Sequence, residues 1–503
     1  MAARRPNVLL ITSDQQHWNT LGVTNPQVKT PNLDRLAAGG TRFDRAYCPN
    51  PTCSPTRSSI ITGRYPSQHG CYSLGTKLPE TERTVGEEFA KAGYKTALVG
   101  KAHFQPLRST DEYTSLESYP ILQDLDFWRG FHGPFYGFDH VELARNHGDE
   151  AHVGQHYAIW MEEKGFTDWR KCFRKPTGTS DPQYGRWNIP EEFHYNAWIA
   201  ERTNALLEQY QREGSNFFLW ASFFDPHPPY IAPAPWDEMY DPDSIDVPEG
   251  RPGEHDKNPP HFKLTQERSP DFSAWKEDGF GLHGLHSHVR EPERRRRDAA
   301  IYYGMVSLLD KYVGVILDRL EALGLSDDTV VVFTTDHGHL YGQHGLIAKG
   351  PFHYEDLIRV PFIVRWPGRV PAGKVSSALQ SLVDLAPTFL SLCGLPVPRT
   401  MTGVDQSRVW LGESPAARDH VVVENHHTPT TMHAKTYVDH RYKLTVYFNR
   451  EYGELFDLES DPGEFDNLWG EPGAKELKAE LMQKLLFAEM AKEPLWMPRI
   501  AGA

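Results

Sequence analysis

Polar side chains that can bind metals or anions follow four short apolar segments of the chain. Each segment is rich in β-branched or aromatic residues and is followed within a few residues by carboxylate, imidazole or ammonium groups. These groups are Asp14 and Gln15; Lys101 and His103; Asp225 and His227; and Asp336, His337 and His339. Ligands of open α/β sheets bind beyond the carboxyl ends of the strands, so we expect the four sets to converge at one sheet edge. Singly, each group has an ordinary structural explanation as a helix cap or a turn residue.

Two of these sets predict a cation site. Asp14 and Asp336 would lie close together, and neighbouring carboxylates must be protonated or matched by positive charge. With Gln15 and His337 beside them they would form a mainly oxygen-lined site. We therefore expect a divalent metal ion at this edge.

The other candidate residues are cationic or can become so. They are Arg57, Lys101, His103, His227 and Lys349. A metal ion and several positive donors in one pocket suit a tetrahedral oxyanion, because they stabilise negative charge on its oxygens. The predicted substrate carries sulfate or phosphate.

A nucleophile is expected in residues 53–59, C-S-P-T-R-S-S. No G-x-S-x-G elbow stands on a strand–turn–helix pattern. Pro55 suits the first position of a short helix, which would place Cys53 at the positive helix end, facing an anion. An unmodified cysteine there is either a reactive thiol or a buried apolar residue.

Short apolar segments alternate with helical ones, which is typical of a mostly parallel sheet covered by helices on both faces. The predicted strands span residues 7–12, 96–100, 217–222, 329–334 and 360–365, so the fold class is α/β. A long amphipathic helix is expected over residues 298–323, ending at Gly324. Residues 104–190 and 230–292 have weak periodicity and are expected to form long excursions that shape a substrate pocket.

The pattern changes after about residue 418. Short strands are predicted at 420–424, 435–439, 442–448 and 454–457, followed by a helix over 474–490. We therefore divide the chain into a catalytic domain, residues 1–417, and a small C-terminal α+β subdomain, residues 418–503. The apolar tail, residues 494–503, is expected to pack on a neighbouring subunit, which predicts a homo-oligomer.

Composition excludes several classes of protein. With 39% hydrophobic residues, and 40 Gly and 39 Pro spread along 503 residues, the chain is neither collagen-like nor wholly disordered. The net charge of −14 argues against a nucleic-acid partner, and the basic cluster at 294–297 fits a solvated helix start. No membrane-length apolar segment stands out, so no membrane partner is expected. Five cysteines are too few for a disulfide framework, which favours the cytoplasm.

The segment C-S-P-T-R at 53–57 matches the C-x-P-x-R signature of type I sulfatases, whose cysteine is converted to formylglycine after translation. Further segments of the chain resemble this family in the expected order. They are N-V-L-L-I-T-S-D-Q-Q at 7–16, G-K-A-H at 100–103, F-D-P-H-P-P-Y at 224–230, T-T-D-H-G-H-L-Y-G-Q-H-G-L at 334–346, A-K-G at 348–350, R-V-P-F-I-V-R-W-P-G at 359–368 and E-L-F-D-L-E-S-D-P-G-E at 454–464. The resemblance spans nearly the whole chain.

This resemblance implies an alkaline-phosphatase-like fold with one divalent cation. Its ligands would be Asp14, the modified Cys53, Asp336 and His337, with Gln15 as a fifth. The commonest family pattern has a second Asp at position 15 and often Asn at position 337. One fewer negative charge and one nitrogen ligand weaken the case for the usual Ca²⁺ and make Mg²⁺ or Mn²⁺ plausible.

The resemblance also implies roles for the cationic residues. His103 resembles the base that promotes release of sulfate from the hydrated formylglycine. His227 and Lys349 resemble the groups that bind sulfate and protonate the leaving oxygen, and Arg57 and Lys101 resemble fixed cations that orient the nucleophile and the anion. The implied activity is hydrolysis of a small-molecule sulfate ester, such as an aryl sulfate, and a formylglycine-generating enzyme is the implied partner.

Two alternatives remain open at this point. A phosphonate monoester or phosphate diester hydrolase of the same superfamily would share the metal site, although that branch tends to carry hydroxyl residues where Lys101 and His103 stand. A catalytically silent protein that binds sulfated ligands would keep Cys53 as a thiol. For the organic end of the substrate, the residues Tyr136, His147, His152, His156 and Trp160 are either an aromatic pocket or packing.

Overall fold

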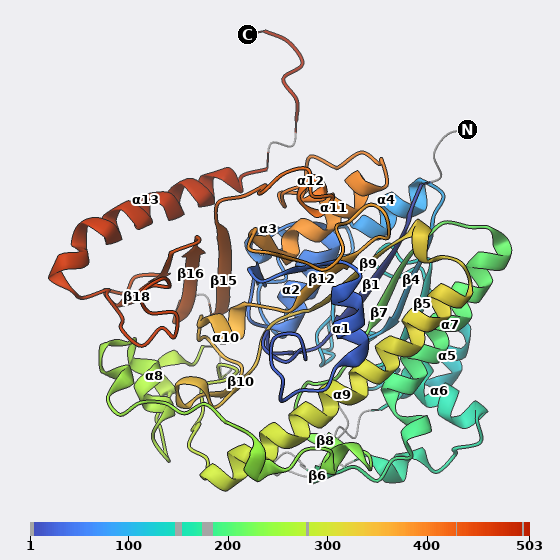
Figure 1. The fold of residues 1–503 in the computed structure, drawn as a ribbon, viewed down its shortest axis with the longest axis horizontal. Helices are drawn as coiled ribbons and strands as arrows, with labels where there is room; N and C mark the ends of the chain where they lie inside the picture. Colours follow the sequence, from blue (N-terminus) through green and yellow to red (C-terminus); the bar gives the residue numbers. More distant parts are fainter. Residues whose placement is uncertain are drawn as a thin grey trace.

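The computed structural model describes residues 5–145, 153–173, 185–277, 281–428, 430–494 and 497–502. Its main feature is an eight-stranded sheet with the order β13-β2-β12-β9-β1-β7-β4-β5 (Figure 1). The strands are β1 Asn7–Ser13, β2 Thr41–Phe43, β4 Lys95–Gly100, β5 His140–Leu143, β7 Phe217–Ser222, β9 Thr329–Thr335, β12 Phe362–Arg365 and β13 Lys374–Ser376. Helices lie on both faces of this sheet, which confirms the predicted α/β class.

The centre of the sheet is parallel. Strand β1 lies between β7 and β9, with Leu10 opposite Trp220 on one side and Val332 on the other. Because β1 is apolar along most of its length, it can be buried on both faces. Its even and odd residues enter different cores: Val8 and Leu10 pack on one face of the sheet, and Leu9 and Ile11 on the other.

Strand β12 differs from the prediction in direction. It pairs with β9 in antiparallel orientation, with Phe362 opposite Thr334, so the sheet is mixed. The chain between β9 and β12 contains no helix long enough to return to the opposite edge of the sheet. The next strand therefore starts near the edge where β9 ends and runs back beside it.

Two groups of helices enclose the sheet (Figure 1). On one face lie α1 Pro31–Ala38, α7 Tyr195–Glu213 and α9 Pro292–Ala322, and on the other lie α2 Cys53–Thr62, α4 Val85–Lys91 and α11 Leu385–Leu392. At α4, the Oγ1 of Thr84 accepts a hydrogen bond from the Glu87 backbone N–H and so caps the helix.

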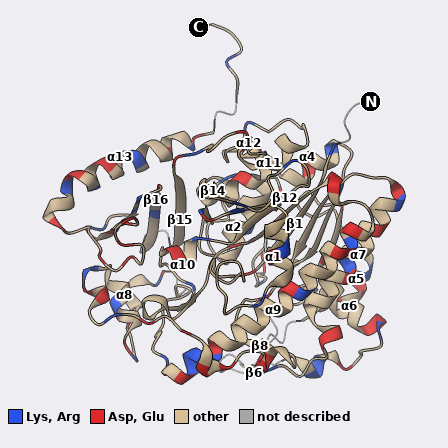
Figure 2. Ribbon diagram, viewed as in Figure 1, with Lys and Arg blue, Asp and Glu red and all other residues tan. Residues whose placement is uncertain are grey.

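Helix α9 is longer than predicted and begins at Pro292. It is the one described helix whose length and apolar content would allow it to cross a membrane, contrary to the expectation from the sequence that no segment approaches this length. Within the protein, 89% of the most apolar 18-residue stretch of this helix is buried. Its charged first turns pair with acids, including Arg295 with Glu249, and Figure 2 shows acidic and basic residues mixed along the helices.

The C-terminal part forms a separate four-stranded antiparallel sheet with a helix across it (Figure 1). The elements are β15 Val421–Thr428, β16 Met432–Val438, β17 Tyr442–Tyr447, β18 Gly453–Asp457 and α13 Lys475–Ala491, close to the predicted bounds. Glu424 of β15 accepts two hydrogen bonds from Ser67, which connects the C-terminal part to the rest of the chain. The domain limit at 417/418 stays a prediction. Met497 and Ile500 of the tail are exposed, and its subunit contact also stays a prediction.

The first long excursion contributes to the sheet. Residues 104–190 contain α5 Leu125–Gly130, β5 and α6 Gln155–Glu163, and β5 pairs with β4 to form the edge strand. Strand β5 has only four residues, including His140 and Glu142, which explains why its hydrophobic pattern is weak.

Candidate active site

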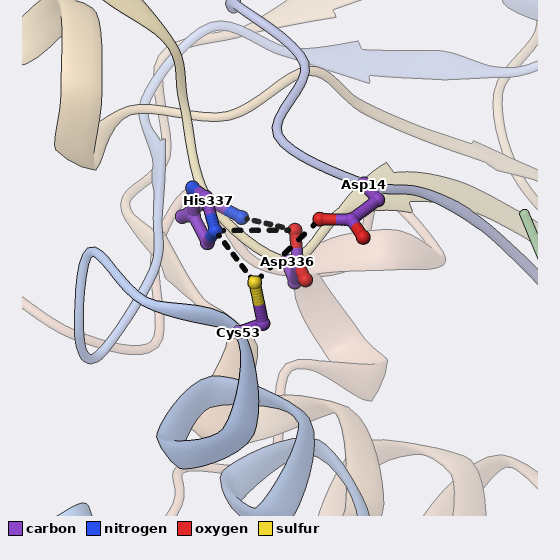
Figure 3. Close-up of side chains that lie close together, drawn as sticks. All are labelled: Asp14, Cys53, Asp336 and His337. Carbon is purple, nitrogen blue, oxygen red and sulfur yellow. Dashed lines mark hydrogen bonds and ion pairs between the residues drawn. The ribbon is translucent and has the colours of Figure 1, made fainter. Parts of the chain in front are cut away.

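Four predicted metal ligands lie together at the carboxyl edge of the sheet. One ligand atom from each of Asp14, Cys53, Asp336 and His337 lies within 4.8 Å of the other three, and Figure 3 shows their side chains pointing toward one another. The Cys53 Sγ lies 3.7 Å from Asp14 Oδ1 and 3.3 Å from His337 Nε2. Because β1 and β9 are parallel neighbours, Asp14 and Asp336 leave the sheet side by side.

Helix α2 brings Cys53 to this edge. The helix starts at Cys53, with Pro55 third rather than first as predicted, so the thiol lies at the first turn (Figure 3). Arg57 is four residues later and therefore lies on the same helix face. Cys53 and Arg57 are 1% and 0% exposed, so both reach the site from inside the protein.

The electrostatics of the two carboxylates favour a bound cation. Burial, reinforced by Asp336, raises the pKa of Asp14 above its ordinary value. Burial alone would raise the pKa of Asp336 as well, but the charge of Arg57 holds it well below the usual range. A cation among these oxygens would offset the cost of keeping Asp14 ionised.

His337 has the protonation state and the orientation of a nitrogen ligand to a metal ion. Burial lowers the pKa of His337 to about 3, so its ring is neutral at physiological pH. The Nδ1–H donates to the Gly338 carbonyl over 2.9 Å, which leaves the lone pair of Nε2 directed toward Cys53. A fixed tautomer of this kind is what metal-binding histidines require.

Gln15 lies beside the same ligands in a left-handed backbone conformation, with φ of 60°. Its backbone N–H donates to Asp336 Oδ1 over 3.0 Å, and its Nε2 donates to His339 Nδ1 over 2.9 Å. The ring of His339 is held in turn by the Tyr230 hydroxyl, 2.9 Å from Nε2. The Oε1 of Gln15 is buried and accepts no hydrogen bond from any described residue, so it fits a metal ion.

Two buried cations bind the carboxylates. The Lys101 ammonium pairs with Asp14, and the Arg57 Nε lies 2.8 Å from Asp336 Oδ2. The Arg57 Nη1 also donates to the Lys101 carbonyl over 2.9 Å and to Ser222 Oγ over 2.7 Å. These contacts fix the guanidinium, while its Nη2 is buried without a hydrogen-bond partner among the described residues.

Lys349 and His227 approach Cys53 from the other side. The Lys349 Nζ lies 3.0 Å from Cys53 Sγ and 3.1 Å from His227 Nε2. The Nδ1–H of His227 donates to the Pro228 carbonyl, so Nε2 can accept the proton of Lys349. With His103 they line the floor of a cavity of about 480 Å³ that reaches Cys53. The predicted metal ligands and cationic residues therefore lie around one point, whereas the Asp225 carboxylate accepts hydrogen bonds from Tyr195 and Asn196 instead.

Glu117 holds the loop that carries His103, a role that no motif or periodicity of the sequence predicts. Its carboxylate accepts hydrogen bonds from the backbone N–H groups of His103, Phe104 and Gln105, over 2.6, 2.8 and 3.1 Å. His103 is in the left-handed region, with φ of 59°, which an ordinary side chain adopts at a cost. Glu117 lies in an irregular segment, where hydrophobic periodicity says nothing about partners.

Substitution Glu117→Leu is expected to destabilise the protein by about 2 kcal/mol or more and to lower kcat at least about tenfold, because three N–H groups lose their acceptor and His103 is displaced. Urea unfolding and steady-state kinetics on the aryl sulfate that the sequence leads us to expect as a substrate would measure both effects. Glu117→Gln keeps one acceptor oxygen, so its stability and kcat should lie between those of the wild-type protein and Glu117→Leu. A wild-type kcat in Glu117→Leu would show that the position of His103 does not depend on the Glu117 carboxylate.

The walls of the cavity come from residues that the sequence analysis did not select. Leu74, Pro106 and Leu107 supply apolar surface, and Arg108 and His283 supply polar groups. A neighbouring cavity of about 640 Å³ shares Leu74 and His283 with the first.

The aromatic residues proposed for a pocket have other positions. The Tyr136 hydroxyl donates to the Leu78 carbonyl, the His156 ring bonds to the Leu143 backbone, and the Trp160 indole donates to Glu201. These three belong to the packing of the fold, and none of them lines the cavity at Cys53. His147 and His152 lie outside the described residues.

Comparisons with known proteins cover nearly the whole chain. A family model described as Sulfatase matches residues 6–395, and one described as N-sulphoglucosamine sulphohydrolase, C-terminal, matches residues 342–491. An arylsulfatase of Clostridium perfringens is 28% identical over 506 residues, covering 97% of this chain and 94% of the relative. An N-acetylglucosamine-6-O-sulfatase of Bacteroides thetaiotaomicron is 25% identical, covering 96% and 86%. A solved phosphonate monoester hydrolase from Silicibacter pomeroyi superposes with a TM-score of 0.79 at 25% identity, covering 98% and 96%.

Proposed function

The chain belongs to the sulfatase family of sulfuric ester hydrolases, and we propose that it cleaves sulfate monoesters with a formylglycine made from Cys53 as the nucleophile. The observation that carries this proposal is the position of Cys53. Its Sγ lies among three potential metal ligands and 3.0 Å from the Lys349 ammonium, at the floor of a cavity.

The donor set at Cys53 fits one divalent metal ion. Asp14 and Asp336 supply oxygens, His337 supplies a neutral nitrogen, and Gln15 offers a buried oxygen without another partner. Such an ion would offset the two carboxylates and favour ionisation of a hydroxyl at position 53. Ca²⁺ is the family's usual ion, and the nitrogen ligand together with the uncharged Gln15 makes Mg²⁺ or Mn²⁺ an alternative.

The surrounding side chains have distinct roles in this proposal. A hydrated aldehyde at position 53 would supply two hydroxyls, one to displace the alcohol from sulfur and one to expel sulfate afterwards. Lys349 and His227 bind the sulfate oxygens and give a proton to the leaving oxygen. Arg57 and Lys101 hold the carboxylates in place.

His103 is proposed as the base for sulfate release. Burial, together with Lys101 and Arg57, lowers the pKa of His103 well below its ordinary value, so the ring is neutral at pH 7, which is the protonation state that a base requires. Its Nδ1 is buried with no hydrogen-bond partner among the described residues, and the ring lines the cavity floor with Cys53.

Hydrolysis of phosphonate monoesters or phosphate diesters is the second candidate. The superposition on the phosphonate monoester hydrolase, with a TM-score of 0.79, favours it. The pair Lys101 and His103 favours sulfate, because Lys101 adds a fixed ammonium at Asp14 and His103 adds a base. We therefore expect sulfate esters to be the better substrates, with some turnover of the phosphorus esters.

Removal of the metal tests the proposal as a whole. Protein produced with a formylglycine-generating enzyme should release sulfate from 4-nitrophenyl sulfate, and dialysis against a chelator should lower the rate by about 10²-fold or more, since uncompensated carboxylates then face the nucleophile. The melting temperature should fall as well, because the ion binds only the folded site. Restoration with Ca²⁺, Mg²⁺ and Mn²⁺ in parallel would rank the ions.

Two results would count against this assignment. Faster release of phosphate or phosphonate than of sulfate under matched conditions would favour the second candidate. No turnover of any ester, with binding of sulfated ligands and a thiol at Cys53 in protein from the native host, would indicate a catalytically silent binding protein.

A further inference from the structure

The cavity above Cys53 has a polar floor and an apolar wall. His103, His227 and Lys349 form the floor, and they are the groups that bind the sulfate in the proposed function. Leu74, Pro106 and Leu107 form the apolar part of the wall, and Arg108, Thr110 and His283 supply its polar groups. The floor accounts for the anionic end of the ester, so the wall and the mouth select the alcohol.

The wall favours a flat apolar ring over a sugar. Leu74, Pro106 and Leu107 carry no side-chain hydrogen-bonding group, so the hydroxyl groups of a sugar ring would lose water there without gaining a partner from these side chains. An aromatic ring would bury apolar surface against the same side chains. A volume of about 480 Å³ accommodates a single aromatic ring with substituents.

Arg108 lies at the mouth of this cavity. It is exposed, and it makes no hydrogen bond or ion pair with any described residue. Two other exposed arginines of this acidic chain are paired, Arg186 with Asp237 and Arg441 with Asp457. An unpaired guanidinium next to an apolar wall can bind a carboxylate through two parallel hydrogen bonds.

The neighbouring cavity is a poorer site for a second anion. Glu277 lines it, and the Glu277 carboxylate is fixed by hydrogen bonds from the backbone N–H and hydroxyl of Thr430. A negative group placed there would be repelled by this carboxylate, whereas Arg108 attracts it. A second anionic group of the substrate therefore belongs on the Arg108 side.

We propose that the substrate is the sulfate ester of an aromatic alcohol that carries a carboxylate, with the ring on Leu74, Pro106 and Leu107 and the carboxylate on Arg108. This inference rests on the proposed sulfatase function, because it assumes that the sulfate group occupies the cavity floor. It adds the chemical class of the alcohol and a residue that determines specificity.

The test compares three esters on the intact, metal-loaded protein. They are 4-nitrophenyl sulfate, 4-carboxyphenyl sulfate and glucosamine 6-sulfate, with the kcat/KM of each measured by sulfate release at constant ionic strength. The carboxylated ester should be preferred over the other two after correction for leaving-group acidity. In Arg108→Ala the ratio of kcat/KM for the carboxylated over the nitrophenyl ester should fall by about 10- to 100-fold, mainly through KM, as expected for loss of a charge-assisted hydrogen bond.

Two further variants make this test specific. Arg399→Ala removes another exposed arginine, which lines none of the cavities at the site, and should leave the ratio at its wild-type value. Arg108→Glu should lower the ratio further and increase the relative turnover of 4-(aminomethyl)phenyl sulfate, because the charge at the mouth is reversed.

The outcomes separate the two hypotheses. An unchanged ratio in Arg108→Ala, or a wild-type preference for glucosamine 6-sulfate, would overturn the assignment of the alcohol while leaving the sulfatase function intact. No sulfate release from any of the three esters would overturn the sulfatase function itself.

Discussion

Substitution Cys53→Ala is expected to abolish turnover of sulfate esters, with a loss in kcat on the order of 10⁴-fold or more, because in the proposed function the nucleophile is made from this side chain. The fold should survive, since the change removes one buried sulfur at a cost of about 1 kcal/mol. Sulfate release and thermal unfolding would measure the two effects on the same preparation.

A matched control for this substitution is Cys393→Ala. Cys393 is a free thiol that is 1% exposed, as Cys53 is, and its Sγ contacts the Pro6 carbonyl. Cys393→Ala should therefore show a similar loss of stability with full activity. Mass spectrometry of the wild-type peptide should find an aldehyde at position 53. Robust sulfate release by Cys53→Ala would mean that another group attacks sulfur.

Substitution Arg57→Met is expected to destabilise the protein by about 3–5 kcal/mol, since it removes one partner of a fully buried ion pair. Asp336 would remain as an uncompensated buried carboxylate, and the Lys101 carbonyl and Ser222 hydroxyl would each lose a donor. Turnover should fall with stability, because Asp336 is one of the proposed metal ligands. Equilibrium unfolding in urea would measure the change.

The control for Arg57 is the exposed pair of Arg35 and Asp318, whose side chains are 50% and 63% exposed. Arg35→Met should change stability by less than about 1 kcal/mol, because solvent screens the pair. If Arg57→Met unfolded at the same urea concentration as Arg35→Met, the buried pair would have no net effect on stability.

The Arg57–Asp336 pair also predicts how the stability of the protein depends on pH. The pKa of Asp336 is held below its ordinary value of 3.8, so its contribution to stability is present above that pH and disappears as the pH falls through the depressed pKa. The difference in unfolding free energy between the wild-type protein and Arg57→Met should therefore be largest near neutral pH and shrink in acid. A difference that grows on acidification would reverse this assignment.

Much of the fold was predictable because its central strands are apolar on both faces. Residues 8–11 and 330–333 are continuously apolar, and this is what burial beneath two layers of helices requires. The direction of β12 was not predictable, because the hydrophobic pattern of a strand is the same whichever way it runs. Strand β5 was missed, since four residues with two polar side chains give little signal.

The candidate site likewise contains some residues whose positions could be predicted from the sequence and others whose positions could not. Asp14, Lys101 and Asp336 follow parallel strands, so their convergence is a consequence of sheet geometry and could be expected from the sequence. Glu117 and Arg108 lie in irregular segments, where the position of a side chain depends on contacts that no periodicity encodes. The left-handed conformations of Gln15 and His103 are also set by tertiary contacts.

The burial of Cys53 limits when it can be modified. A thiol that is 1% exposed, at the start of a helix packed beneath the sheet edge, is out of reach of another protein's catalytic groups once α2 has docked. A converting enzyme would have to act on the nascent, still extended polypeptide. The fraction of molecules that carry the modification would then be set during synthesis in the producing cell. Later treatment of the purified, folded protein would not change it.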